Sequence, residues 1–106
     1  MPGSPITVLI VYQARPGKAE EGLDSLASLV ATVVAEEPAC LGITIHQDAS
    51  DAARVLLLEE WVDKASYVGP HMLTPHIRAF IEKAPELFAG PPDISFWEAR
   101  GGNRSA

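Results

Sequence analysis

Val55-Leu-Leu-Leu-Glu-Glu-Trp-Val62 is an apolar run interrupted by two glutamates. Its β-branched and aliphatic residues predict a β-strand. Successive strand residues point to opposite sides of a sheet, so the leucines of this run fall on both faces. A strand that is apolar on both faces must be covered on both. We therefore expect helices on one side of the sheet and a second apolar layer on the other.

Three more strands and two helices are predicted around this run. The other strands are expected at Ile6–Tyr12, Leu41–His46 and Ile94–Trp97, and the polar segment 48–52 should form the turn before the run. The first helix should extend from about Lys18 to Glu36, before Pro38. The order βαββαβ predicts an α+β, ferredoxin-like fold, with a four-stranded antiparallel sheet and both helices on one face.

The second helix is predicted in two pieces. Asp63 can cap its start, Gly69-Pro70 interrupts it, and Thr74-Pro75 restarts it, with Thr74 as the N-cap. Spacings of three and four predict one buried stripe on each helix. The expected stripes are Leu23, Leu26, Ala27, Val30, Val33 and Val34 on the first helix, and Leu73, Ile77, Phe80, Ile81 and Ala84 on the second.

Length and composition indicate a single domain. The chain has 106 residues, and we assign residues 6–99 to the domain, 1–5 to an N-terminal extension and 100–106 to a flexible tail. The net charge of −6 disfavours nucleic acid and anionic membranes as partners. A single cysteine, Cys40, cannot form an internal disulfide, and we expect a cytoplasmic protein.

The sheet face that lies away from the helices should also be apolar. The first strand places Leu9 and Val11 on the face opposite Val8 and Ile10, and the quoted run adds its even-numbered leucines. Such a patch would be large if it stayed in water. We therefore expect a homodimer in which two sheets pair face to face about a two-fold axis.

A ligand pocket is expected where the broken helix faces the third strand. Glu59 and Trp61 share one strand face, and the broken helix offers Tyr67, His71 and His76. Other interpretations stay open, because Trp61 can be plain core with a bonded N–H, and Tyr67 and His71 can be structural. The two histidines do not share a helix face, and no carboxylate or Cys completes a set, so we expect no metal site.

Four passages occur in a shared order and spacing. They are the turn Arg15-Pro-Gly-Lys18, the segment Glu37-Pro-Ala-Cys-Leu41, the strand ending Glu59-Glu-Trp61, and His71-Met-Leu-Thr-Pro-His76. The third resembles an E-x-W strand ending followed by Asp63 and an aromatic residue, and the fourth is similar to an H-x-x-(S/T)-P-H segment. Together they resemble the antibiotic biosynthesis monooxygenase superfamily of dimeric α+β barrels, over about Ile6 to Glu98.

The resemblance implies oxidation by O2 without any cofactor. The implied substrate is an electron-rich phenol, quinol or polyketide-type aromatic, which is deprotonated and then reacts with O2. In the catalytic roles that the resemblance implies, Trp61 would wall the pocket, Tyr67 would hydrogen-bond a substrate oxygen, and His71 would be the base or the anion partner. We place the remaining substrate contacts at Leu57, Glu59, His76 and Phe80.

Two positions depart from patterns within the superfamily. Members that oxidise polyketide anthrones have an asparagine where this chain has Leu57, and haem-degrading members have one where it has Ile10. A dimeric module that binds a small hydrophobic metabolite without catalysis is therefore the alternative hypothesis. Haem binding through His71 is a third and less favoured hypothesis.

Overall fold

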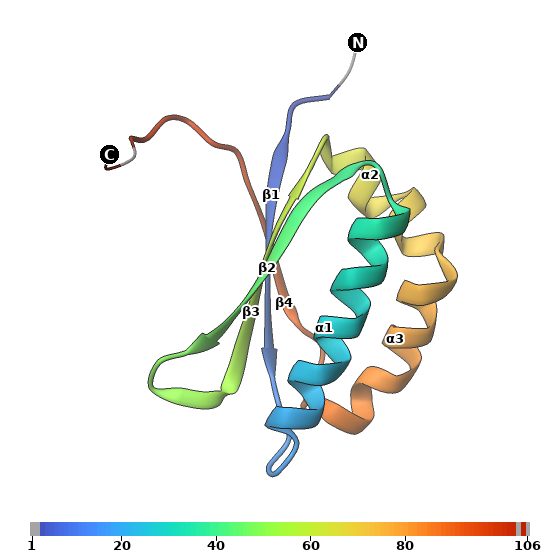
Figure 1. Ribbon diagram of the computed structural model, residues 1–106, viewed down its shortest axis with the longest axis vertical. Helices are drawn as coiled ribbons and strands as arrows, with labels where there is room; N and C mark the ends of the chain where they lie inside the picture. The colour runs from blue at the N-terminus through green and yellow to red at the C-terminus, as the bar shows by residue number, and fades with distance from the viewer. Residues whose placement is uncertain (1–2, 104, 106) are drawn as a thin grey trace.

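The computed structural model of the protein describes residues 3–103 and residue 105. Four strands form one sheet, and the helices pack beside it (Figure 1). The elements are β1 (Ile6–Gln13), α1 (Ala19–Glu36), β2 (Cys40–Asp48), β3 (Asp51–Trp61), α2 (Lys64–Val68), the 3-10 helix η1 (Pro70–Leu73), α3 (Pro75–Leu87) and β4 (Asp93–Trp97). The predicted ferredoxin-like α+β fold is confirmed.

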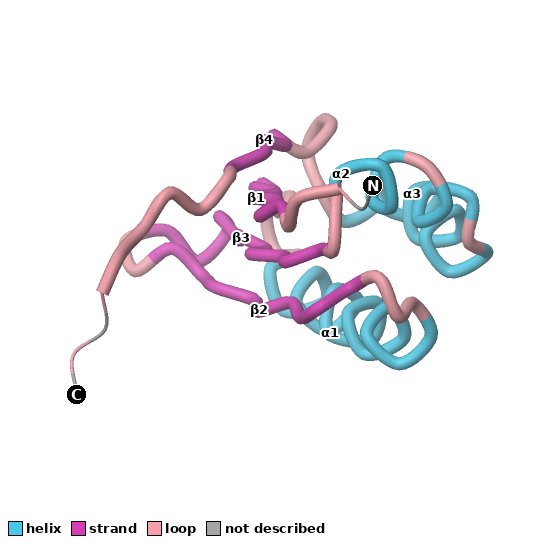
Figure 2. The backbone as a smooth tube through the Cα atoms, turned by 90° about the horizontal axis from the view of Figure 1, so that it is seen from above, coloured by secondary structure: helices cyan, strands magenta, loops and turns pink. Residues whose placement is uncertain are grey.

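The four strands form one antiparallel sheet in the order β2-β3-β1-β4. Figure 2 shows the helices together on one side of this sheet, and no helix of residues 3–103 covers the other side. In the register of the two central strands, Val8 lies opposite Glu59 and Ile10 lies opposite Leu57. This register places the odd-numbered residues of β3 and the even-numbered residues of β1 on the helix side.

The core lies between the sheet and the helices. Along β1 and β3 the helix-facing side chains are buried: Ile6, Val8, Ile10, Tyr12, Val55, Leu57, Glu59 and Trp61. Trp61 has no exposed surface. Leu57, Glu59 and Trp61 therefore face the helices. The carboxyl of Glu59 is thus the polar exception in an otherwise apolar or aromatic row.

The predicted helix stripes were too wide. On α1 the residues Ala27 and Val34 are exposed, and Leu29 packs against the core instead. A helix that lies on one sheet face buries only a narrow stripe, so residues at its edge reach solvent. In the second helix, Leu73 and Ile81 are exposed as well. Leu73 belongs to η1, and its spacing to the residues of α3 is therefore not that of one continuous helix.

The hairpin between β2 and β3 is tighter than predicted. Strand pairing continues to Asp48 opposite Asp51, which leaves only two residues in the turn rather than the segment 48–52. The Asp48 carboxylate accepts a hydrogen bond from the Ser50 N–H at 2.7 Å, and the Asp51 carboxylate accepts one from Ala53 at 3.0 Å. Aspartate carboxylates that accept hydrogen bonds from nearby backbone N–H groups stabilise tight turns. Strand propensity alone does not predict such a turn.

The assignments of the N-terminal extension and of the flexible C-terminal tail remain predictions in part. The assigned extension includes residues 1 and 2, and the assigned tail includes residues 104 and 106, all of which lie outside the described residues. Within residues 3–103 and 105, no helix combines the length and apolar character needed to cross a membrane.

Candidate active site

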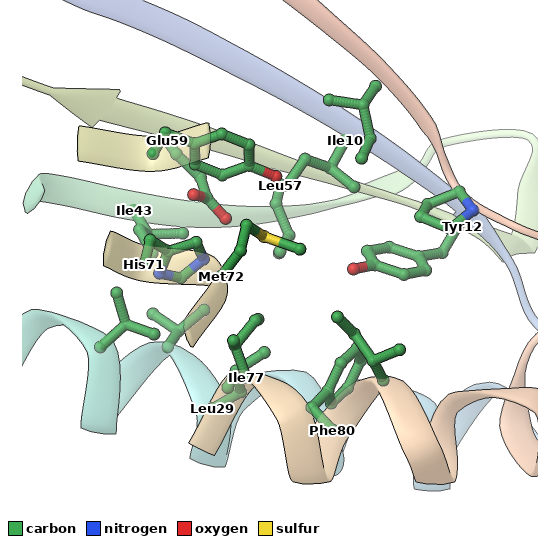
Figure 3. A pocket seen from close by; sticks show the side chains of 16 residues that line it. Ile10, Tyr12, Leu29, Ile43, Leu57, Glu59, His71, Met72, Ile77 and Phe80 are labelled. Carbon is green, nitrogen blue, oxygen red and sulfur yellow. The ribbon is translucent and has the colours of Figure 1, made fainter. Parts of the chain in front are cut away.

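A cavity of about 230 Å³ lies between the helix side of the sheet and the broken second helix. Figure 3 shows aliphatic and aromatic side chains around most of it. The strand side of its wall includes Ile10, Ile43 and Leu57, and the helix side includes Leu29, Ile77 and Phe80. An engineered apolar cavity of about 150 Å³ holds benzene, so this larger cavity has room for a fused-ring aromatic.

The histidine of the broken helix sits at one end of this cavity. Gly69 and Pro70 end α2 because proline lacks an N–H, and the chain then makes the turn η1, which carries His71. Thr74 closes the turn: its hydroxyl donates to the His71 carbonyl at 2.8 Å and accepts from the Ile77 N–H. His71 is 3% exposed and lines the cavity. The helix break therefore positions this imidazole.

A carboxylate orients the His71 ring. Both carboxylate oxygens of Glu37 lie 3.0 Å from His71 Nδ1, and one of them lies 2.6 Å from His76 Nε2. A carboxylate accepts hydrogen bonds, so these ring nitrogens carry the protons. His71 Nε2 makes no hydrogen bond to any described residue. Every wholly buried side-chain nitrogen or oxygen among the described residues has a partner, so His71 Nε2 is not wholly buried. We infer that this nitrogen is accessible from the cavity.

The prediction that no carboxylate accompanies the two histidines was wrong. Glu37 follows α1 and lies 34 residues before His71, a contact that sequence spacing does not reveal. The three side chains bond to one another. Among the described residues, no group of three or more His, Cys, Asp or Glu side chains is arranged to hold a metal ion. We interpret this cluster as a hydrogen-bonded support for His71.

Glu59 brings a second carboxyl group to the same end of the cavity. It is 4% exposed, and its Oε1 accepts a hydrogen bond from Trp61 Nε1 at 2.9 Å. Burial, opposed by this bond and reinforced by the charge of Glu37, raises the pKa of Glu59 from 4.5 to about 7. Its second oxygen has no bonded partner among the described residues. Near neutral pH, Glu59 can therefore accept or donate a proton toward the cavity.

Tyr67 and Trp61 surround His71 in different ways. The Tyr67 ring stacks on the imidazole at 5.1 Å between centroids, and it also lines the cavity. Burial and the charge of Glu59 raise the pKa of its hydroxyl, which stays protonated and can donate a hydrogen bond. Trp61 packs on His71 at 4.7 Å but does not line the cavity. The structure places Trp61 behind the site, where its N–H holds Glu59.

Some of the remaining predicted substrate contacts line the cavity, and one does not. Leu57 and Phe80 line the cavity, whereas His76 bonds to Glu37 outside it. Leu57 also pairs across the strands with Ile10, so the two positions that depart from the superfamily's asparagines together form an apolar floor. Tyr12, which the sequence placed only at the end of the first predicted strand, lines the cavity too. Its position on an apolar strand gave no signal of this role.

A second, more open hollow adjoins the first. It measures about 450 Å³ and shares four wall residues with the inner cavity, namely Tyr12, Phe80, Ile81 and Pro92. Its outer part is formed by the end of α3 and the Gly90-Pro-Pro92 segment, with Arg15 at its edge. This arrangement provides an approach to the inner cavity from the end remote from His71.

Known proteins resemble this chain in sequence and fold. The uncharacterized protein sll1783 of Synechocystis is 29% identical over 94 residues, which cover 89% of this chain and 63% of that protein, so the chain spans less than two thirds of its length. The crystal structure of PA3566 from Pseudomonas aeruginosa is 28% identical, with a TM-score of 0.83, and the match covers 95% of this chain and 99% of that one.

A Nitrosomonas europaea protein proposed to be an antibiotic biosynthesis monooxygenase has the same fold. Its TM-score is 0.83 at 17% identity, and the match covers 94% of each chain. The family model for antibiotic biosynthesis monooxygenases matches residues 5–83, which is most of the sequence. On this match, the chain belongs to the antibiotic biosynthesis monooxygenase family.

Proposed function

We propose that the inner cavity binds an electron-rich phenol, quinol or polyketide-type aromatic and that the protein catalyses its oxidation by O2 without a cofactor. The observation that carries this proposal is that His71 and Glu59 both lie at one end of an apolar cavity. Glu37 orients the first, and burial keeps the second partly protonated at neutral pH. Two titratable groups in contrasting environments are what acid–base chemistry requires.

Binding would place the hydroxyl of the substrate at this polar end. The aromatic rings would then fill the space between Leu57 and Phe80, where apolar walls exclude water. His71 Nε2 would take the phenolic proton, and Glu37 would stabilise the imidazolium that forms. Tyr67, or the protonated form of Glu59, would donate a hydrogen bond to the oxyanion.

Oxygen chemistry would follow at a substrate carbon. The anion transfers an electron to O2, and a C–O bond forms to one oxygen atom, which gives a peroxide. His71 returns its proton to this peroxide. Loss of the hydrogen on the same carbon then breaks the O–O bond, and the distal oxygen leaves as water. In sum, the substrate gains one oxygen atom and loses two hydrogens, and O2 is consumed in equal amount.

Oxygen uptake by the purified protein tests this proposal. Metal-free and flavin-free protein is expected to consume O2 in the presence of anthrone or a dihydroxynaphthalene, saturably and above a heat-denatured control. Binding of these aromatics without any uptake would instead support the non-catalytic module. A Soret band on titration with haem that disappears in His71→Ala would support the haem hypothesis.

We also propose that the protein is a homodimer through the uncovered face of the sheet. Four aliphatic side chains lie half-buried at the centre of that face: Leu9, Val11, Leu56 and Leu58. At its edge, Trp97 is 57% exposed. An apolar centre with an aromatic residue beside it is the composition expected of an interface between subunits.

Charge at the centre of this face should separate the subunits. Leu58→Glu is expected to weaken the dimer at least about a hundredfold, because an unpaired buried charge costs several kcal/mol. Light scattering at micromolar concentration measures the change. Val34→Glu, on the exposed side of α1, is the matched control and should leave the mass unchanged. A parent protein that is monomeric under these conditions would exclude the dimer.

A further inference from the structure

The inner cavity has a second polar end that the proposed chemistry does not use. Figure 3 shows the Tyr12 hydroxyl pointing into the cavity from the end opposite His71 and Glu59, with Leu57 and Met72 between them. The register explains this separation. Tyr12 lies four residues beyond Val8, the strand partner of Glu59 and on the same face, so the backbone positions of Tyr12 and Glu59 are about 13 Å apart along the strands.

The Tyr12 hydroxyl is left without a hydrogen-bond partner in the part of the chain that the structure describes. Tyr12 is 7% exposed, yet its oxygen makes no hydrogen bond to any residue that the structure describes. A buried tyrosine normally finds a hydrogen-bond partner. Every wholly buried side-chain oxygen among the described residues has a hydrogen-bond partner, so the unbonded Tyr12 hydroxyl is not wholly buried. It is accessible from the cavity into which it points.

Two phenylalanines fix the Tyr12 ring. Phe80 meets it edge-on at 6.1 Å between centroids, and Phe88 lies against it at 4.7 Å. Phe88 is almost wholly buried, so the tyrosine cannot turn its hydroxyl away without disturbing the core. Burial, together with the nearby acidic groups of Tyr67 and Glu59, raises the pKa of the hydroxyl, which therefore stays a neutral donor.

We propose that Tyr12 binds a second oxygen function of the substrate, at the end of its ring system remote from His71. The site would then prefer aromatics that carry oxygen at two opposite positions, such as 1,4-dihydroxynaphthalene, over monophenols of the same size. This inference rests on the proposed function. It specifies the substrate class, because an apolar residue at position 12 would leave the second oxygen unpaired.

Anaerobic binding of two matched aromatics tests the assignment without any turnover. The parent protein and Tyr12→Phe are each titrated calorimetrically under argon with 1,4-dihydroxynaphthalene and with 1-naphthol. The parent is expected to bind the diol about five- to tenfold more tightly than the monophenol, which is the effect of one neutral hydrogen bond. Tyr12→Phe should abolish this preference and leave the affinity for 1-naphthol unchanged.

Tyr67→Phe is the matched control at the opposite end of the cavity. Both ligands present an oxygen there, so this variant should weaken both to a similar degree. Thermal unfolding of Tyr12→Phe should match the parent, because the lost hydroxyl has no partner among the residues that the structure describes. Equal effects of Tyr12→Phe on both ligands, or none on either, would overturn the role of Tyr12 and leave the proposed function standing. If neither aromatic binds the parent, both proposals fail.

Discussion

Glu59→Gln is expected to make the fold about 3 kcal/mol more stable than the parent at about pH 8.5, and equally stable at about pH 4. The buried carboxyl has a pKa of about 7, against 4.5 for the same group in an unfolded chain. Each unit of difference between two such values is worth about 1.4 kcal/mol. Ionising Glu59 in place therefore costs folding free energy, whereas the amide of glutamine carries no charge.

The direction of this pH dependence follows from the raised pKa. The contribution of the protonated carboxyl to the free energy of unfolding is complete below about pH 4.5, and it is lost as the pH rises through about 7. Urea unfolding of parent and variant at both pH values, at one protein concentration, gives the difference directly. Glu82→Gln, which removes an exposed carboxyl from α3, is the control. A pH-independent gap between parent and Glu59→Gln would mean that Glu59 ionises freely.

His71→Ala is expected to lower kcat/KM for phenol oxidation by about 10²- to 10⁴-fold, the usual contribution of a general base. The loss should fall mainly on kcat, because His71 forms a small part of a largely apolar wall. Rates of oxygen uptake over a range of substrate concentrations, up to saturation, separate kcat from KM. Added imidazole should restore part of the activity, since the deletion leaves space beside Glu37.

His76→Gln is the matched comparison for the loss of His71. The glutamine amide can still donate to Glu37, and residue 76 lies outside the cavity. We expect this variant to lose less than about tenfold in kcat/KM, because it perturbs only the support of the base. If His71→Ala keeps activity within a few fold of the parent, or if both variants fall equally, then His71 is not the base.

The fold could be read from the sequence because strand order and apolar periodicity act locally. A run that is apolar on both faces, a helix ended by Pro38 and a break at Gly69-Pro70 each correspond to a feature of the structure. The helix stripes were less predictable. Whether Val34 or Leu29 meets the sheet depends on how α1 rotates against it, and spacing alone does not determine this rotation.

The site was predictable only in part. Tyr67 and His71 lie close together in sequence near a helix break, and the structure brings both to the cavity. Glu37 could not be assigned, because its contact with His71 joins the end of α1 to η1 across the packed layer. Tyr12 was hidden for another reason. Its ring is core, and only the three-dimensional arrangement shows that its hydroxyl faces a cavity.

Oxygen-isotope labelling tests the central claim most directly. Metal-free and flavin-free protein would be incubated with anthrone under ¹⁸O₂, and the product and water analysed by mass spectrometry. The proposed chemistry predicts a quinone with one labelled oxygen and an equal amount of labelled water, formed by the parent and not by His71→Ala. Formation of product at the rate of a heat-denatured control, or equally by both proteins, would contradict it.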